Sequence, residues 1–246
     1  MKGYINKVST KLHTNYSKLN NLLYKLSVIK LGEKENIMII IFGTTNERKT
    51  DDLKNIINLL GLDIEIKTLS DISWNRGEIE ETGTTVEENS LIKATAIYDF
   101  CKNNDINYPI LTDDAGLFVE SLNGEPGVYT ARYADKELSQ DKNLPKYECV
   151  NKLLRNLKGI TNRKAYYKCV VTCMYPDGSY FQNEGISSGE ITEEITEPIK
   201  KPYFYSVFKL LESDKTFNLL DEEELNDTYR YQALRKVLTR VYKDNL

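Results

Sequence analysis

Two adjacent carboxylates, Asp113 and Asp114, follow the apolar run Tyr108 to Leu111. The run has the composition of a buried strand, and Gly116 is expected to turn the chain after the acidic pair. Ligands of α/β proteins gather beyond the carboxyl ends of the strands. Two carboxylates so close together must be hydrated, paired with cations or bound to a metal. The pair therefore indicates either a metal and water-activating centre or an ordinary acidic junction between strand and turn.

A polar loop with a lysine follows an earlier apolar run. Residues Ile37 to Phe42 are continuously apolar, which is typical of a strand covered on both faces. An amphipathic helix through Leu53 and Leu60 is expected next, ending at Gly61. The loop and the start of this helix contain Thr44, Thr45, Asn46 and Lys49. Such a layout can direct backbone N–H groups and a helix N-terminus toward a phosphate, but it is also that of a plain helix cap with a solvated lysine.

Two further groups of residues could act with these. Thr85 and Glu88 have the spacing of a capping box, which predicts a helix through Leu91 to Phe100. Glu88 therefore lies in a first helical turn, where acidic residues are favoured by the helix dipole alone, and Lys93 lies further along the same helix. Arg132 ends a turn-rich segment that begins at Asn123.

The composition and net charge of the chain argue against several classes of protein. The chain has 246 residues and a net charge of −4, which gives no argument for a nucleic-acid-binding surface. Its apolar runs are too short to span a bilayer, and the N-terminus lacks the pattern of a signal peptide. Cys169 and Cys173 fall on one face of a predicted strand, which favours core packing over metal binding or disulfides. A cytoplasmic protein without a membrane or nucleic-acid partner is expected.

The single histidine, His13, lies in a segment that precedes the predicted domain. A Ser-His-Asp or Cys-His mechanism would require this residue to reach back into the core. The chemistry is therefore expected to depend on carboxylates, lysine, arginine, tyrosine or a bound metal ion.

The chain divides into a helical appendage, residues 1–35, and a domain, residues 36–246. In the appendage, apolar residues recur on one face of a helix that Gly32 ends. The expected elements of the later part of the domain are a strand over 117–121, a helix over 142–158, two strands over 165–174 and 179–186 joined by a hairpin turn at Pro176-Asp177-Gly178, an aromatic strand over 203–208 and a helix from about Thr228.

Four blocks, taken in order, resemble the inosine triphosphate pyrophosphatase family. T-T-N-E-R-K at 44–49 resembles the family's T-G-N-x-x-K loop. E-T-G-T-T-V-E-E-N-S-L-I-K-A at 81–94 resembles E-x-G-x-T-F-x-E-N-A-x-x-K-A. L-T-D-D-A-G-L at 111–117 resembles A-D-D-S-G-L, and L-N-G-E-P-G-V-Y-T-A-R-Y-A at 122–134 resembles L-x-G-x-P-G-V-Y-S-A-R-Y-A. The resemblance extends from about residue 37 to 238.

The resemblance implies an elongated, curved mixed β-sheet flanked by helices, with two lobes, a central cleft and usually a homodimer. It implies cleavage of a nucleoside triphosphate between the α- and β-phosphates with Mg²⁺, with Mn²⁺ as an alternative. Asp114 would activate water beside Asp113, and Glu88 and Asp114 would hold the metal. The triphosphate would contact Thr44, Thr45, Asn46, Lys49, Lys93 and Arg132.

The third part of the family signature departs from the pattern. The family's G-F-G-Y-D-P-x-F is K-P-Y-F-Y-S-V-F at 201–208, and its S-H-R is T-Y-R at 228–230. By the resemblance these positions hold the base, so the candidate base-binding residues are Phe204, Tyr205, Thr228, Tyr229 and Arg230. The aromatic residues could stack on an altered base or could simply pack in the core.

Three functions remain open. The first is a pyrophosphohydrolase for inosine, xanthosine or other modified nucleotides with altered base specificity, since lost hydrogen-bonding groups lower discrimination. The second is a nucleotide-binding or interaction protein of this fold with reduced hydrolysis, docking through residues 1–35. The third, favoured least by the D-D-A-G-L and P-G-V-Y-T-A-R blocks, is a hydrolase of the unrelated Maf family.

Overall fold

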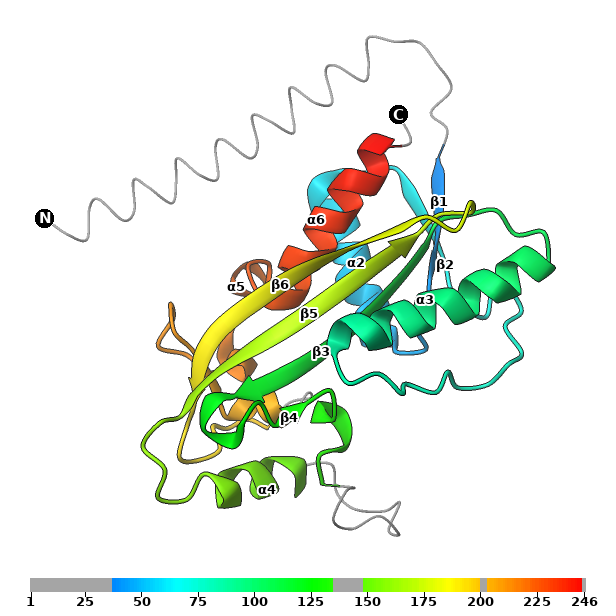
Figure 1. Ribbon diagram of the computed structural model, residues 1–246. Coiled ribbons are helices and arrows are strands. Elements are labelled where there is room, and N and C mark those ends of the chain that lie inside the picture. The colour runs from blue at the N-terminus through cyan, green and yellow to red at the C-terminus, as the bar shows by residue number, and fades with distance from the viewer. Residues whose placement is uncertain (1–36, 135–147, 200–202, 245–246) are drawn as a thin grey trace, which may run out of the picture.

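The computed structural model describes residues 37–134, 148–199 and 203–244, so the predicted N-terminal helix and His13 lie outside the described residues. The described chain folds around one mixed, seven-stranded sheet with the order β2-β1-β3-β5-β6-β7, and β4 pairs with β3 off this path. Long, curved strands connect the two lobes of the molecule (Figure 1). The expected α/β architecture is confirmed.

The sheet is parallel at one end and antiparallel at the other. Strands β1 (Met38–Phe42), β2 (Ile64–Lys67) and the start of β3 (Ile110–Val119) run parallel. The remaining strands are antiparallel to their neighbours: β4 (Pro126–Gly127), β5 (Lys164–Met174), β6 (Tyr180–Ile191) and β7 (Phe208–Leu210). The predicted hairpin turn between β5 and β6 is confirmed, with Gly178 at a φ of +86°.

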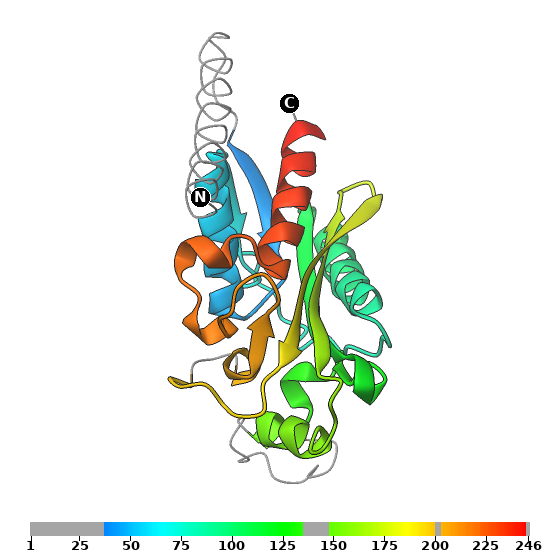
Figure 2. The same ribbon diagram turned by 90° about the vertical axis from the view of Figure 1, so that its left-hand side faces the viewer.

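Helices cover both faces of the sheet (Figure 2). Helix α3 (Val86–Asn103) packs on one face against β3 and β5, and α2 (Glu47–Leu60) and α6 (Tyr229–Asp244) lie together on the other. Helix α4 (Glu148–Asn156) belongs to the second lobe, and α5 (Glu222–Leu225) is one short turn. Short 3₁₀ segments are η2 (Glu120–Leu122), η3 (Thr130–Arg132), η4 (Tyr203–Ser206) and η5 (Phe217–Leu219).

The sequence signals for the helix ends are confirmed. Thr85 and Glu88 form the capping box of α3, in which each side chain accepts a hydrogen bond from the backbone of the other residue. Gly61 ends α2 at a φ of +64°, a conformation that favours glycine. These signals depend only on neighbours along the chain, so they can be predicted from the sequence before the fold is known.

The expected turn at Gly116 is wrong. Strand β3 runs straight through the acidic pair and ends at Val119, and residues beyond it form η2 rather than strand. Gly116 serves a close approach instead: a Cβ at this position would lie 2.5 Å from the carbonyl oxygen of Gly127. Position 116 therefore needs glycine so that β4 can pair with β3, and the carboxylates lie inside a strand.

Two other expected elements differ in extent or type. The helix predicted over 142–158 is described from Glu148 to Asn156, and its expected start lies outside the described residues. The aromatic strand predicted over 203–208 is the 3₁₀ segment η4, and extended pairing begins only at Phe208. The Ser206 hydroxyl donates a hydrogen bond to the Tyr203 carbonyl over 2.6 Å, a local interaction that competes with strand pairing.

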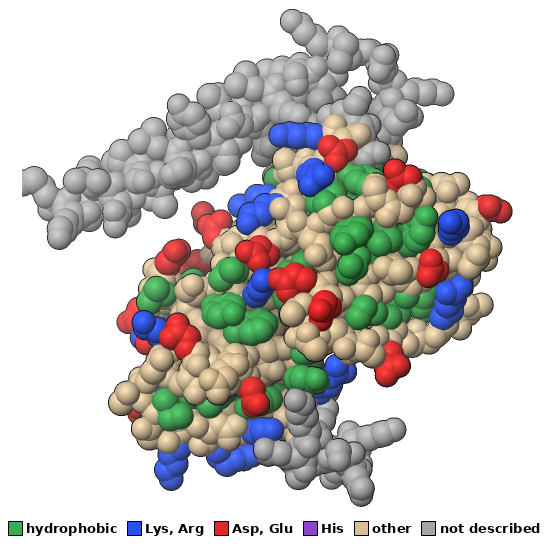
Figure 3. All heavy atoms as spheres, in the orientation of Figure 1, with side chains coloured by type: hydrophobic (Ala, Val, Ile, Leu, Met, Phe, Trp, Pro, Cys, Tyr) green, Lys and Arg blue, Asp and Glu red, His purple; other side chains and the backbone are tan. Residues whose placement is uncertain are grey.

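Charged side chains of both signs lie on the face of the molecule shown in Figure 3. On the face shown in Figure 3, acidic and basic side chains alternate between small apolar patches.

The four cysteines of the chain are all reduced and buried, with Cys169 and Cys173 on the same face of β5, as predicted. Within the described ranges, no helix combines the length and the apolar character that a membrane span requires.

Candidate active site

A gap in strand pairing marks the candidate site. Strand β1 pairs with β3 only as far as Phe42 and Leu111, and β4 pairs with β3 only from Leu117 onward. Between these points, residues 112–116 pair with β5 along one edge, while along the other edge no described strand pairs with them. The gap therefore exposes the middle of a central strand to side chains and loops from both lobes.

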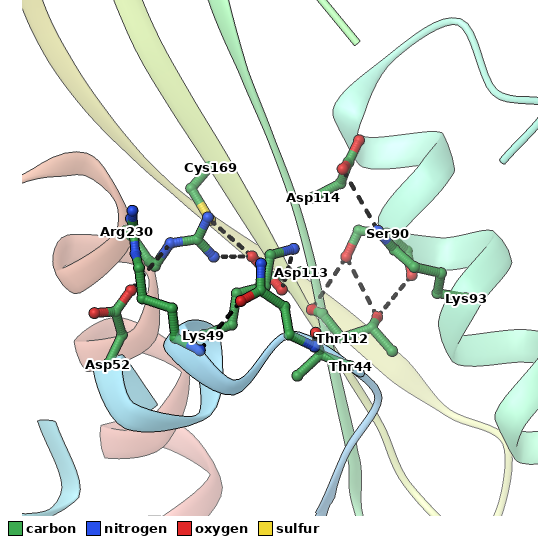
Figure 4. Close-up of polar contacts among 12 residues, drawn as sticks. Thr44, Lys49, Asp52, Ser90, Lys93, Thr112, Asp113, Asp114, Cys169 and Arg230 are labelled. Carbon is green, nitrogen blue, oxygen red and sulfur yellow. Dashed lines mark hydrogen bonds and ion pairs between the residues drawn. The ribbon is translucent and has the colours of Figure 1, made fainter. Parts of the chain in front are cut away.

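Asp113 and Asp114 lie at this gap on opposite faces of the sheet. Successive side chains of a strand point to opposite faces, and Figure 4 shows the two carboxylates directed away from each other. Asp113 faces α2 and α6, and Asp114 faces α3. The two carboxylates therefore do not form one acidic pair, since each has its own set of partners.

Asp113 is a buried anion held by two cations. Its side chain is only 1% exposed, Lys49 Nζ lies 3.0 Å from its Oδ1, and the Arg230 guanidinium contacts its Oδ2. Burial by itself would raise the pKa of this carboxyl, but the charges of Arg230 and Lys49 outweigh that effect and hold the pKa well below its ordinary value. Asp113 is therefore ionised throughout the physiological range.

Asp114 is a buried carboxylate with weaker compensation. Lys93 Nζ lies 3.4 Å from Asp114 Oδ1, and Asp114 Oδ2 is buried without a hydrogen-bond partner among the described residues. Burial raises the pKa of Asp114 above its ordinary value, against the attraction of Lys93 and with the repulsion of Glu81. The adjacent aspartates thus have pKa values shifted in opposite directions, which is a recurring feature of acid–base sites.

Lys93 joins Asp114 to a second carboxylate. Its Nζ lies 2.9 Å from Glu81 Oε1, so one ammonium group contacts both acids. Although burial opposes the charge of Lys93, Asp114, Asp113 and Glu81 raise its pKa overall. Two carboxylates and one ammonium group therefore lie together on the α3 side of the gap.

A buried hydroxyl network fixes α3 to the sheet at this point. The Ser90 and Thr172 hydroxyls lie 2.7 Å apart, and the Thr112 hydroxyl donates to the Ser90 carbonyl over 2.7 Å. All three residues have no exposed surface. Since Ser90 precedes Lys93 by three residues and Thr112 precedes Asp114 by two, this network sets the distance between the ammonium group and the carboxylate (Figure 4).

The segment before α3 is tied to the start of the helix. Glu88 Oε2 accepts hydrogen bonds from the Thr84 backbone, the Thr84 hydroxyl and the Thr85 backbone, at 2.6–3.2 Å. The Asn89 side-chain oxygen accepts from the Gly83 backbone over 2.8 Å, and a Cβ at Gly83 would lie 2.7 Å from that oxygen. The Glu88 carboxylate predicted to bind metal is thus engaged in capping, and the segment it anchors carries Glu81.

The predicted phosphate loop lies beside the gap. The Thr44 hydroxyl accepts from the Asn46 backbone over 3.1 Å, and the Asn46 side chain caps α2 by accepting from the Arg48 backbone over 3.1 Å. Thr45 is exposed. The loop therefore brings the N-terminus of α2, and with it Lys49, to the open edge of β3.

The predicted base-binding residues form a closed cluster. The Tyr205 and Tyr229 hydroxyls lie 2.8 Å apart, and Arg48 Nη2 donates to the Tyr205 hydroxyl over 3.1 Å. The Tyr229 ring stacks on Tyr167 with centroids 4.8 Å apart. Phe204, Tyr205 and Tyr229 are all buried. In this conformation these aromatic side chains pack against one another.

The three remaining predicted binding residues, Arg230, Thr228 and Arg132, have different partners. Arg230 points to Asp113 and Asp52, and the buried Thr228 donates its hydroxyl to the Leu225 carbonyl over 2.7 Å. Arg132 is exposed on η3, with its guanidinium 5.6 Å from the centroid of the Tyr129 ring. No ion pair or hydrogen bond within the described ranges joins Arg132 to the aspartates.

The comparisons with known proteins agree with this architecture. A model of the Ham1 family matches residues 40–240. The chain belongs to the Ham1 family. This is the inosine triphosphate pyrophosphatase-like family that the four sequence blocks resemble, and the match favours it over the Maf family.

Curated relatives and solved structures extend over most of the chain. The dITP/XTP pyrophosphatase of Thermoanaerobacter pseudethanolicus is 36% identical over 210 residues, covering 84% of this chain and 98% of the relative. That of Borreliella burgdorferi strain ZS7 is 33% identical over 187 residues, or 76% and 87% of the two chains. The structure of the Staphylococcus aureus Ham1 protein aligns with a TM-score of 0.70 at 29% identity, covering 85% of this chain and all of that one.

In this Ham1 family member, Glu81 is a candidate site residue that the sequence blocks did not single out. Its position in the 81–94 block gave no reason to prefer it to Glu88, which has an obvious place in a helical turn. The usable signal was Gly83, because a glycine two residues after Glu81 indicates that the backbone must pass close to another element. In the structure that element is α3, and Glu81 reaches Lys93 as a result.

The residues on the α3 side of the gap fit a hard divalent cation. Asp114 Oδ2 is buried without a partner, and Glu81 supplies a second carboxylate near the same ammonium group. Mg²⁺ commonly takes one or two carboxylates and completes its shell with phosphate oxygens and water. Across residues 37–134, 148–199 and 203–244, no cluster of three or more His, Cys, Asp or Glu side chains is arranged around a metal position.

The two aspartates should respond oppositely to loss of charge. Asp113→Asn should lower the free energy of unfolding by about 3–5 kcal/mol, since it leaves Lys49 and Arg230 without their buried partner. Asp114→Asn should leave stability unchanged or raise it, because a carboxyl whose pKa is raised on folding opposes folding when ionised at neutral pH. Urea unfolding of both variants at pH 7 measures the difference, and equal destabilisation would contradict it.

Proposed function

We propose that this protein is a Mg²⁺-dependent nucleoside triphosphate pyrophosphohydrolase that cleaves between the α- and β-phosphates, giving a monophosphate and pyrophosphate. The curated relatives named dITP/XTP pyrophosphatases support this reaction class. The observation that carries the proposal is the different surroundings of two adjacent carboxylates at the gap in the sheet: Asp113 is held by Lys49 and Arg230, whereas Asp114 shares Lys93 with Glu81 and keeps a buried oxygen without a hydrogen-bond partner among the described residues. Homodimerisation and a cytoplasmic location stay predictions from the sequence.

The cations around the gap can bind the triphosphate. Lys49 and Lys93 approach the open edge of β3 from opposite faces, and the α2 N-terminus adds backbone N–H groups. Lys49 keeps 21% of its side chain exposed although it contacts Asp113, so this residue is only partly covered at the edge of the gap. In this proposal Thr44, Thr45 and Asn46 shape the loop that carries these donors.

Asp114 is the proposed general base. Its raised pKa gives the carboxylate a stronger affinity for a proton than an ordinary aspartate has, which suits removal of a proton from the attacking water. The water oxygen forms a bond to phosphorus, the bridging oxygen leaves with pyrophosphate, and the water proton passes to Asp114. Asp113 remains an anion that holds Lys49 in place.

Glu81 and Asp114 are the residues that would hold Mg²⁺, with Mn²⁺ as an alternative, and Glu88 would hold the segment that carries Glu81. Bound there, the cation would neutralise charge that develops on the phosphate oxygens during cleavage. Lys93 contacts both carboxylates, so it holds them together in the absence of the ion and can turn toward phosphate in its presence.

The base specificity is proposed to differ from that of the relatives. Tyr205 and Tyr229 replace residues that the family resemblance assigns to the base, and Arg48 lies against the Tyr205 ring at 5.2 Å from its centroid. The same closed cluster favours the second candidate function, a nucleotide-binding protein with little turnover. A purine could enter only if this cluster rearranged.

Activity against a panel of nucleotides separates the two functions. Purified protein with Mg²⁺ should release pyrophosphate from at least one of ITP, XTP, dUTP and other modified triphosphates. Asp114→Asn should reduce that rate by about 10²–10⁴-fold, the usual contribution of a general base. Binding without release from every nucleotide, with Mg²⁺ or Mn²⁺, would favour the second function, and a fully active Asp114→Asn variant would contradict the assignment of the base.

The decrease of kcat/KM at low pH should follow the protonation of Asp114. Activity should fall as pH falls through the raised pKa of this carboxyl, because the protonated form cannot accept a proton. Lys93→Met removes the positive charge that opposes the shift, so the acid limb of kcat/KM should move upward by about one pH unit. Lys168→Met is the matched control, since Lys168 pairs with Glu87 and Glu184 instead. An unmoved limb in Lys93→Met would exclude Asp114 as its source.

The two glutamates can be distinguished by their dependence on metal. Glu81→Gln should raise the Mg²⁺ concentration needed for half-maximal rate by at least about 10–100-fold, since loss of a group that only orients a metal ligand already has an effect of this size. Glu88→Gln keeps a capping oxygen, since Gln also fits this position of a capping box, and should leave the Mg²⁺ requirement nearly unchanged. The rate is measured as a function of free Mg²⁺ concentration for both variants. A larger metal effect in Glu88→Gln would return the ligand role to Glu88.

A further inference from the structure

A closed ring of charges surrounds the buried carboxylate of Asp113. Lys49 contacts Asp113 at 3.0 Å, Arg230 contacts Asp113 on its other oxygen, and Arg230 Nε lies 3.5 Å from Asp52 Oδ2. Asp52 lies on α2 three residues after Lys49, so the ring returns to the helix in which it began (Figure 4). It holds two cations and two anions.

The ring attaches α2 to the rest of the molecule at two points one turn apart. Residues i and i+3 lie on the same helical face, so Lys49 and Asp52 both point toward the sheet and α6. Lys49 reaches β3 directly, while Asp52 reaches the same carboxylate through Arg230 of α6. These two attachments add to the packing of the buried residues Leu53, Ile56 and Ile57 and hold the first turns of the helix in one orientation.

The contact between Arg230 and Asp52 is largely shielded from solvent. The Arg230 side chain is 9% exposed and that of Asp52 is 16% exposed, so water compensates little for a lost contact. The Tyr231 hydroxyl also donates to Asp52 Oδ1 over 3.3 Å, which holds the carboxylate toward Arg230. The neighbouring Asp51 is exposed and only reaches Lys54 at 4.0 Å.

We propose that Asp52 is a positioning residue for the phosphate site: through Arg230 and Asp113 it fixes the place of the Lys49 ammonium group. The proposal deepens the proposed function and rests on it, since it assigns Lys49 to the polyphosphate. Asp52 itself touches neither phosphate nor metal. By positioning Lys49, Asp52 is expected to strengthen phosphate binding, whereas its negative charge alone would weaken that binding by repelling the ligand.

Because position and charge predict opposite changes in phosphate affinity when Asp52 is replaced, a binding measurement can distinguish them. Inorganic tripolyphosphate is titrated calorimetrically into the full chain without metal, so binding is measured in the absence of turnover. Asp52→Asn should weaken binding about tenfold, a coupling typical of residues in one charge network, even though it removes a negative charge. Asp51→Asn removes the same charge one residue away and should leave binding unchanged or slightly stronger.

The same substitution made in Lys49→Met protein shows whether the effect of Asp52 on tripolyphosphate affinity depends on Lys49. In Lys49→Met protein, which binds more weakly, adding Asp52→Asn should change the affinity less than twofold, because the group that Asp52 positions is gone. Asp52→Glu should recover part of the affinity. Tyr231→Phe, which keeps all four charges, should weaken binding in the same direction but less, and it tests the ring if Asp52→Asn does not fold.

The outcomes separate this inference from the proposed function. Equal affinities of Asp52→Asn and Asp51→Asn, or a full effect of Asp52→Asn in Lys49→Met protein, would overturn the positioning role. No binding of tripolyphosphate by the unaltered chain would also overturn it. Binding with the expected pattern but without release of pyrophosphate from any nucleotide would support the ring and overturn only the proposed turnover.

Discussion

The buried ion pairs of Asp113 connect the main parts of the described structure. This carboxylate lies in the middle of a central strand and contacts cations from α2 and α6. An isolated ionised carboxylate at such a place would be too costly to bury, so its position requires the cations of both helices. The packing of α2 and α6 against the sheet and the ionised state of Asp113 therefore depend on each other.

The same arrangement separates two roles within one pair of neighbouring residues. The pleat of β3 directs Asp113 toward two cations and Asp114 toward one lysine that is shared with Glu81. The first carboxylate is fixed as an anion, and the second keeps a raised affinity for protons and an unpartnered oxygen. An acidic pair at a strand end would have placed both groups in one environment and could not have produced this difference.

The polar groups near the gap are supported by interactions that cross the sheet. Ser90, Thr112 and Thr172 form a buried hydroxyl network between α3, β3 and β5. Glu88 and Asn89 hold the segment that carries Glu81. By contrast, the aromatic cluster around Tyr205 and Tyr229 satisfies its hydroxyls internally. The charged groups at the gap thus keep an unpartnered oxygen in Asp114 and partial exposure in Lys49, while the aromatic cluster that the resemblance assigns to the base is closed.

The amino-acid sequence by itself determined the α/β class, the caps of α2 and α3, the β5–β6 hairpin and the membership of most proposed site residues. Those features depend on local periodicity, on capping hydrogen bonds and on blocks of residues that stay together along the chain. The sequence also placed Gly116 in a turn, because the approach of β4 that requires this glycine involves residues distant along the chain. It gave no sign of the contact between Glu81 and Lys93 for the same reason, and the metal role assigned to Glu88 stays a prediction. Only the tertiary structure decided that the aspartates face opposite sides, since that requires β3 to continue past a glycine that β4 approaches. It also decided their pKa shifts, because burial and the positions of Arg230, Lys49 and Lys93 arise from packing between elements.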